Sequence, residues 1–199
     1  MILSKKKNHE HDGDNEILTQ RRYNETYIKL AKERIIFISE DITNELAAEL
    51  SAMLLYYDHQ DNNELIEMYV NSDGGAATGL INIYDVMQMI SSPIKTVCIG
   101  KCYSAAAVIL AAGTKGQRFA LKNSQVMIHG LQFGFPIPGH DITNSKNYFQ
   151  FIKENNDMIM KMLSKHTGNN LEKVKEDCLR DVWMTSVEAL SYGIVDYVI

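Results

Sequence analysis

Three polar segments of this sequence could carry chemistry, and each directly follows a short apolar run. The first is the turn at residues 71–75, which contains the paired glycines Gly74 and Gly75. Paired glycines let the backbone approach a bound group closely and can leave amide N–H groups pointing outward at the start of a helix. Such a turn could hold an anion or an oxyanion, although an ordinary tight turn between a strand and a helix explains the same residues.

The second segment, residues 100–107, contains Ser104 just before a predicted helix. At a helix N-terminus the amide N–H of Ala105 can stabilise negative charge, and the small neighbouring alanines leave room for a substrate. The position suits a nucleophile. A serine before a helix is also a common N-cap, and the segment does not match the G-x-S-x-G elbow, so both interpretations stay open.

The third segment is His129, which follows the apolar run QVMI and precedes Gly130. A histidine where a buried strand emerges can act as a general base, or it can be a half-buried polar group with a backbone partner. All three segments lie at the carboxyl ends of predicted strands, where open parallel sheets place their sites. This shared location favours one common site.

The elements that would position these residues alternate along the chain. Apolar residues spaced by three and four predict helices over 44–57, from near Thr78 to Met87, and over 143–165, the last of which we expect to project from the body. Alternation implies βαβ units, right-handed crossovers and a mainly parallel sheet, so the predicted fold class is α/β. Short runs of largely β-branched or aromatic residues predict strands at 35–38, 66–70, 96–99, 118–121 and 125–128.

The C-terminal region carries clear helix boundary signals. Thr185 and Glu188 form a capping-box pattern, and Gly193 can end the helix that begins there. The remaining apolar run, residues 194–199, predicts a final strand.

Length and composition set the domain organisation. A chain of 199 residues with 45% hydrophobic residues predicts one compact domain over residues 17–199. Residues 1–16 have no apolar group after Leu3, so we expect a flexible N-terminal arm. His9 and Asp12 lie in this arm, and without a fixed scaffold we assign no metal to them.

Charge and cysteine content narrow the functional classes. A net charge of −5 provides no large cationic surface, so nucleic acid is not an expected partner. No apolar stretch approaches the roughly 20 residues needed to cross a bilayer, so we expect no membrane insertion. Three cysteines form no even disulfide framework, which favours a reducing, cytoplasmic location.

Taken together, these segments resemble the proteolytic subunit of the Clp protease family, a self-compartmentalised serine peptidase. The resemblance begins near Tyr27 and leaves out only the arm and the stretch around residues 133–150. An ordered series of motifs is far more specific than any one of them. The series is NSDGG, GLINIYDVMQMI, CIGKCYSAAAVILAAGTKGQRFALKNSQVMIH and HTGNNLEKVKEDCLRDVWMTSVEALSYGIVDYV.

The resemblance implies a catalytic role for several of these residues. Ser104 would be the nucleophile, His129 the general base and Asp181 the acid that orients the imidazole. The amides of Gly75 and Ala105 would form the oxyanion hole. By the same mapping, substrate binding falls on Gly74 and Leu131, and docking of an unfoldase falls on Tyr69 and Met89.

The resemblance also implies an assembly. The expected fold is shared with crotonases and adds a protruding strand-and-helix handle over about residues 130–165. Copies of this chain, or this chain with a paralogous subunit, would form two stacked heptameric rings that hydrolyse unfolded polypeptides inside a chamber. An AAA+ unfoldase would dock outside and use ATP, and the chain itself would need no cofactor and no metal.

The sequence departs from the family pattern at several positions. Asp73 stands where a proline is usual and would add negative charge beside the oxyanion hole. Pro136 and Pro138 interrupt a strand expected to pair with substrate. Glu67 replaces an aromatic residue in the expected docking cleft. We therefore hypothesise a divergent paralogue in a mixed barrel. A weakly active structural or regulatory ring member and a crotonase-like acyl-CoA hydratase or isomerase are the alternatives.

Overall fold

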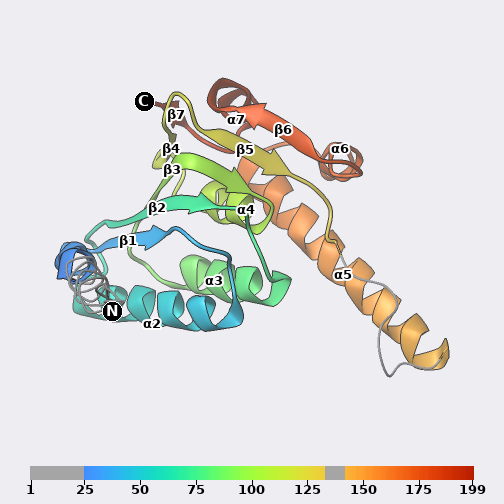
Figure 1. The fold of residues 1–199 in the computed structure, drawn as a ribbon, viewed down its shortest axis with the longest axis horizontal. Coiled ribbons are helices and arrows are strands. Elements are labelled where there is room, and N and C mark those ends of the chain that lie inside the picture. The colour runs from blue at the N-terminus through green and yellow to red at the C-terminus, as the bar shows by residue number, and fades with distance from the viewer. Residues whose placement is uncertain (1–24, 133–141) are drawn as a thin grey trace, which may run out of the picture.

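The computed structural model describes residues 25–132 and 142–199 (Figure 1). The predicted arm at residues 1–16 and the prolines Pro136 and Pro138 lie outside these ranges. A helical segment over residues 25–32 comes first. The labelled elements that follow are β1 (Ile35–Ile38), α2 (Asn44–Gln60), β2 (Ile66–Ser72), α3 (Ala77–Met89), β3 (Ile94–Tyr103), α4 (Ala105–Ala111), β4 (Arg118–Ala120), β5 (Gln125–Ile128), α5 (Ile142–Thr167), α6 (Leu171–Asp177), β6 (Val182–Thr185), α7 (Ser186–Tyr192) and β7 (Tyr197–Val198).

The strands form a single, mainly parallel sheet, which confirms the predicted α/β class. Strand β3 is central, because its first half pairs in parallel with β4 and its second half pairs in parallel with β5. The order β1-β2-β3-β4-β7 continues along the sheet. Strand β6 was not predicted, and it pairs antiparallel with β5. The predicted last strand is shorter than expected, since only Tyr197 and Val198 pair.

The helices bury the apolar face of the sheet. In Figure 1, α2 and α3 lie side by side along β1 and β2. Helix α4 is buried on every side, because it lies against β3 and also contacts α3 and α5. Its sequence AAAVILA is apolar all round, as expected for a helix enclosed by the core. This helix starts at the residue after Ser104, so the core fixes the position of that serine.

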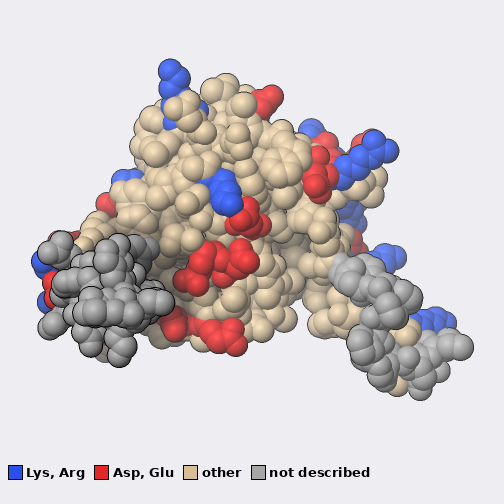
Figure 2. Space-filling model, viewed as in Figure 1, with Lys and Arg blue, Asp and Glu red and all other residues tan. Residues whose placement is uncertain are grey.

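The long helix α5 has two dissimilar halves. It spans 26 residues, which corresponds to about 39 Å. Ile159, Met160, Met162 and Leu163 are buried in the core, whereas most residues before Asn155 are exposed. Figure 1 shows the first half projecting from the body, as the sequence predicted. Figure 2 shows basic and acidic side chains mixed over α6, basic side chains along the projecting part of α5, and a group of acidic side chains in the middle of this face, over the region of α2 and α3.

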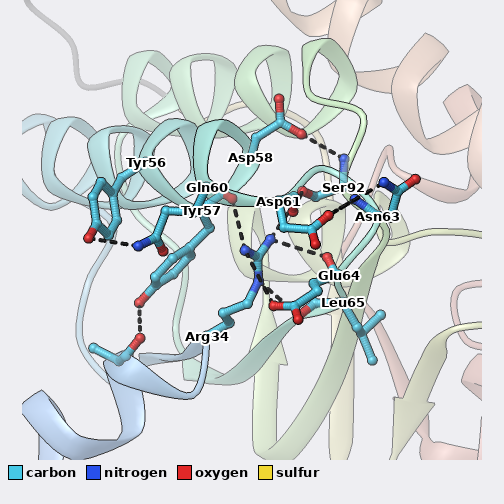
Figure 3. Close-up of polar contacts among 11 residues, drawn as sticks. Arg34, Tyr56, Tyr57, Asp58, Gln60, Asp61, Asn63, Glu64, Leu65 and Ser92 are labelled. Carbon is cyan, nitrogen blue, oxygen red and sulfur yellow. Dashed lines mark hydrogen bonds and ion pairs between the residues drawn. The ribbon is translucent and has the colours of Figure 1, made fainter.

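A buried arginine fixes the entrance to β1. Arg34 has a positive φ of 61°, and its side chain is 8% exposed (Figure 3). Its guanidinium donates to the carbonyls of Tyr57, Glu64 and Leu65 at 2.8, 3.2 and 3.3 Å and to the Ser92 hydroxyl at 3.1 Å. These bonds join the end of α2, the start of β2 and the turn before β3 around one charge.

A second buried arginine, Arg118, holds the C-terminal segment against β4 and the end of α5. Arg118 forms a two-pronged ion pair with Asp196, with N···O distances of 2.7 and 2.9 Å. It also donates to the carbonyls of Ala111 and His166. Burial raises the pKa of the Asp196 carboxyl, but hydrogen bonds from Arg118 and Lys115 outweigh it and hold this pKa well below its usual value.

The predicted boundaries of α7 are confirmed. Thr185 and Glu188 form both bonds of a capping box, and Gly193 ends the helix in the left-handed conformation. An added Cβ at Gly193 would collide with the Thr167 carbonyl at the end of α5. Within the described ranges, no helix is both long and apolar enough to cross a membrane.

Candidate active site

Ser104 lies at the junction of β3 and α4 in a strained backbone conformation. Its φ and ψ are 54° and −122°, and its side chain makes no capping hydrogen bond to α4. A conformation of this kind costs about 1–3 kcal/mol for a residue with a Cβ. The Ser104 amide donates to the Met127 carbonyl at 2.8 Å, which ties the turn to β5. The Ser104 hydroxyl therefore does not cap α4 and is free to contact another group.

His129 meets this hydroxyl. It is the first residue after β5, and pairing of β5 with the end of β3 carries its ring toward Ser104. The distance from His129 Nε2 to Ser104 Oγ is 2.7 Å, and the His129 side chain is 12% exposed. A nucleophile within hydrogen-bond reach of a base is the arrangement that general-base activation requires.

Asp181 lies on the other side of the imidazole but contacts it loosely. Its Oδ1 is 3.5 Å from His129 Nδ1, and the Asp181 side chain is 46% exposed. Nδ1 is the only buried side-chain nitrogen or oxygen without a hydrogen-bond partner in the described part of the chain. To accept the Ser104 proton, Nε2 must be unprotonated, so a neutral ring carries its proton on this unpartnered Nδ1.

The missed strand β6 explains why Asp181 is near. Val182 pairs with Ile128 in the antiparallel register, so the residue before β6 lies beside the residue after β5. The signal was the apolar run VWMT, which is as short as the run QVMI of β5. Recognised as a strand, this run would have made Asp181 a candidate without any resemblance.

The glycine turn packs directly against the serine. An added Cβ at Gly74 would lie 2.7 Å from the Tyr103 carbonyl and 2.8 Å from Ser104 Cβ. An added Cβ at Gly75 would collide with the Ile42 backbone. The Gly74 carbonyl accepts from the Ile42 amide at 2.7 Å, and this bond fixes the turn to the residues before α2. Only glycine fits at either position.

Two amides remain available beside the serine hydroxyl. Among the described residues, the N–H groups of Gly75 and Ala105 donate no hydrogen bond. Both residues line a cavity of about 160 Å³ together with Ser104, His129 and Leu131. The remaining walls are mostly apolar, so a negative charge that forms here would find these two donors in a low-dielectric setting.

A model of the Clp protease family matches residues 18–199 of this sequence. The chain belongs to the Clp protease family. Membership makes it a Clp-type proteolytic subunit and therefore a peptidase. The α/β architecture described above agrees with this fold.

Asp73 stands where the Clp family usually has proline, and its charge was expected to oppose an oxyanion. The carboxylate is instead paired with Lys101, with an N···O distance of 2.5 Å. This hydrogen bond raises the pKa of Lys101, which keeps the ammonium charged. The ion pair is half exposed, and it offsets the negative charge that the sequence placed beside the turn.

The expected docking residues of the Clp family lie on separate elements. Tyr69 is on β2, where its ring stacks on Phe37 with centroids 5.2 Å apart. Burial raises the Tyr69 pKa, and a hydrogen bond to Glu67 adds to the effect. Met89 ends α3 and is 66% exposed.

The Glu67 carboxylate is also paired. It accepts from Lys95 at 3.0 Å and from the Tyr69 hydroxyl at 2.9 Å. The carboxylate that was expected to weaken an apolar cleft is therefore partly neutralised by its neighbours on β2 and β3.

The described residues contain no cluster of three or more His, Cys, Asp or Glu side chains that could hold a metal ion. Cys98, Cys102 and Cys178 are buried free thiols. The pKa of Cys178 is raised to about 12, mainly by burial. This thiol therefore stays protonated at neutral pH and is not a candidate nucleophile.

Proposed function

We propose that this chain is a serine endopeptidase that hydrolyses unfolded polypeptides through a covalent acyl-enzyme. The observation that carries this proposal is the 2.7 Å contact between His129 Nε2 and the strained, non-capping Ser104 hydroxyl. The two free amides beside the hydroxyl add the second requirement of acyl transfer, which is a place for the oxyanion.

The chemistry follows from these groups. Nε2 of His129 removes the Ser104 proton as Oγ attacks the peptide carbonyl, and the amides of Gly75 and Ala105 hold the tetrahedral oxyanion. The imidazolium then protonates the leaving amine, and the C–N bond breaks to leave an acyl-Ser104 ester. A water molecule, deprotonated by His129, hydrolyses this ester and restores the serine. No step requires a metal or an organic cofactor.

Asp181 would support the imidazolium after a small movement. The Asp181–His129 separation of 3.5 Å must shorten by about 0.5 Å to reach normal hydrogen-bond length. The unpartnered Nδ1 favours such closure, because a buried donor without an acceptor costs about 1–3 kcal/mol. We place this closure in the substrate complex or the assembled particle.

Substrate would occupy two neighbouring cavities that share lining residues. Gly74 packs on the Ser104 side of the cleft, and Leu131 lines both the 160 Å³ cavity and a larger cavity of about 480 Å³ beside Asp181. The smaller cavity is walled by Leu80, Val108, Ile159 and Leu163. We therefore assign it to an apolar side chain next to the scissile bond.

The proposal extends to assembly and partners. The exposed first half of α5 supports stacking of two heptameric rings, built from this chain alone or together with a paralogous subunit. Tyr69 and Met89 are the proposed contacts for an AAA+ unfoldase, which would consume the ATP. We place the particle in the cytoplasm, in keeping with three buried free thiols.

A second candidate function is that of a structural or regulatory ring member with little activity of its own. The loose contact between Asp181 and His129 favours it, because an unsupported imidazole is a poor base. The family match argues against the crotonase-like alternative.

A fluorophosphonate probe separates these functions. An active peptidase becomes labelled at Ser104, and Ser104→Ala abolishes the labelling. A regulatory member becomes labelled only after its partner subunit is added. Absence of labelling in both settings would refute the peptidase proposal, and native mass spectrometry of the particle from its own host would show whether one or two subunit types are present.

A further inference from the structure

Asp181 contacts the His129 ring loosely, at 3.5 Å, whereas the two residues that follow His129 are held by backbone hydrogen bonds. The Gly130 amide donates to the Cys178 carbonyl at 2.8 Å, and the Leu131 amide donates to Asn156 Oδ1 at 2.8 Å. Strand pairing of β5 ends at Ile128, so neither bond belongs to the ladder with β6. These two bonds hold the segment that leaves the catalytic histidine.

The space around Gly130 shows how closely the Cys178 carbonyl and the Asn156 side chain approach this backbone. An added Cβ at Gly130 would lie 3.1 Å from the Cys178 carbonyl and 3.3 Å from Asn156 Oδ1. The backbone after His129 is thus enclosed between the end of α6 and the middle of α5. The side chain of Asn156 supplies the α5 half of this enclosure.

The location of Asn156 on α5 makes this contact firm. The helix packs into the core from Ile159 onward, less than one turn after Asn156. Asn156 is half-buried and also lines the cavity that contains His129 and Asp181. A rigid helix therefore presents an acceptor to the Leu131 amide, two residues from the general base.

We propose that Asn156 is a positioning residue for the general base: its side-chain oxygen, by holding the Leu131 amide, keeps His129 Nε2 within hydrogen-bond distance of Ser104 Oγ. This inference rests on the proposed peptidase function. It gives Asn156 no contact with the reacting atoms, and its effect passes through the 129–131 backbone. Loss of the acceptor frees this backbone, and a displacement of a catalytic group by about 1 Å can reduce a rate by on the order of 100-fold.

The test compares three variants of the full-length chain. Asn156→Leu removes the acceptor at similar volume, and Asn156→Asp keeps an acceptor oxygen in the same place. Asn155→Leu is the matched control, because Asn155 is half-buried on the same turn of α5 and its side chain makes no hydrogen bond within the described ranges. Thermal unfolding of each variant checks that the fold is retained.

The readout is the rate of Ser104 modification by a fluorophosphonate, together with kcat and KM for a peptide. We expect Asn156→Leu to lower the labelling rate and kcat by about tenfold with little change in KM. Asn156→Asp should recover most of this loss, and Asn155→Leu should match the wild type. A purely structural role would lower the unfolding temperature without changing the labelling rate of the folded protein.

The outcomes separate the two proposals. If the wild type becomes labelled at Ser104 and Asn156→Leu has the same labelling rate and kcat, the positioning role is overturned and the proposed peptidase function stands. Loss in Asn156→Leu that Asn156→Asp does not recover would also overturn it, since the acceptor would then be irrelevant. Absence of Ser104 labelling in the wild type, alone and in its native particle, would remove the peptidase function and this inference with it.

Discussion

The buried side chain of Arg34 and the largely buried side chain of His129 differ in how their hydrogen bonds are satisfied. The side chains of Arg34 and His129 are 8% and 12% exposed. Each guanidinium nitrogen of Arg34 donates to at least one acceptor, whereas His129 Nδ1 has no partner among the described residues. The cluster around Arg34 is complete within one chain, but the proposed catalytic cluster around His129 is not. A buried polar atom without a hydrogen-bond partner is costly, and here that atom, His129 Nδ1, belongs to the site proposed to bind substrate.

The largest expected effect is at Asp181, the potential partner of the unpaired His129 Nδ1. If Asp181 closes on Nδ1 during the reaction, Asp181→Asn should lower kcat by on the order of 10⁴-fold, because the amide favours the wrong imidazole tautomer. Steady-state peptide hydrolysis measures this loss, with Ser104→Ala as the zero-activity reference. A loss of only a few-fold would mean that Asp181 stays apart from His129 Nδ1 and that the site works without the Asp181 carboxylate.

At Arg34 the expected loss is in stability rather than activity. Arg34→Met leaves the Tyr57, Glu64 and Leu65 carbonyls without their buried donor, and we expect the free energy of unfolding to fall by about 3 kcal/mol. Urea denaturation measures the change, and exposed Lys32→Met should stay within about 0.5 kcal/mol of the wild type. Peptidase activity per folded molecule should be unchanged. A large activity loss would show that the two clusters are coupled.

The glycine turn offers a sharper comparison, because two glycines share a positive φ but differ in surroundings. An added Cβ at Gly74 meets Ser104, while one at Gly116 meets no atom within 4 Å. Gly116→Ala should cost about 1 kcal/mol of stability from backbone strain, and Gly74→Ala should cost more, because its Cβ also collides with the Tyr103 carbonyl. Only Gly74→Ala should also reduce kcat, by about 100-fold, through displacement of Ser104. Equal activity in the two variants would contradict the tight packing of this turn against the nucleophile.

The smallest effect concerns His166, whose Nε2 lies 3.0 Å from the Tyr84 hydroxyl. Burial lowers the His166 pKa to about 4, helped by the positive charges of Lys165 and Arg118. The unfolded chain binds the proton more tightly, so stability should fall as pH decreases from about 6.5 to about 4, and then level off. For this half-buried ring we expect a contribution of about 1 kcal/mol. His166→Gln should flatten this part of the stability curve, and an unchanged slope would exclude His166 as its origin.

Much of the fold was predictable because its elements are regular. Strands β1 and β5 and the long helix α5 were placed within a few residues, since their apolar residues follow the expected periods. Strand β3 is longer than predicted: it continues through Gly100 to Tyr103, and its register with β2 shifts there. In the sequence, Gly100 was interpreted as the residue after the end of a strand. In the structure it has a φ of 90° and lies at an irregularity within β3.

The site was predictable in part, and the reason differs from residue to residue. Ser104 and His129 stood out by their places at strand ends, but Asp181 was reached only through the family resemblance. Strand β6 is four residues long, and a run as short as VWMT carries too little pattern to be told apart as a strand. Asn156 gave no signal at all, because an asparagine in a polar helical stretch has no pattern that indicates a bond to the Leu131 amide.

Strand β3 has a consequence for the dynamics of the site. Because β3 is paired on both sides and leads into the buried helix α4, the proposed nucleophile Ser104 is attached to the part of the chain that we expect to be most strongly protected from exchange. The proposed base, His129, is followed by a segment for which two hydrogen bonds are seen within the described ranges, from the Gly130 and Leu131 amides. Amide hydrogens of β3 should therefore exchange with deuterium only on global opening, whereas those of Gly130 and Leu131 exchange through local opening. Serine and histidine would then belong to different foldons, and the temperature at which the catalytic pair separates would lie below that at which the sheet melts.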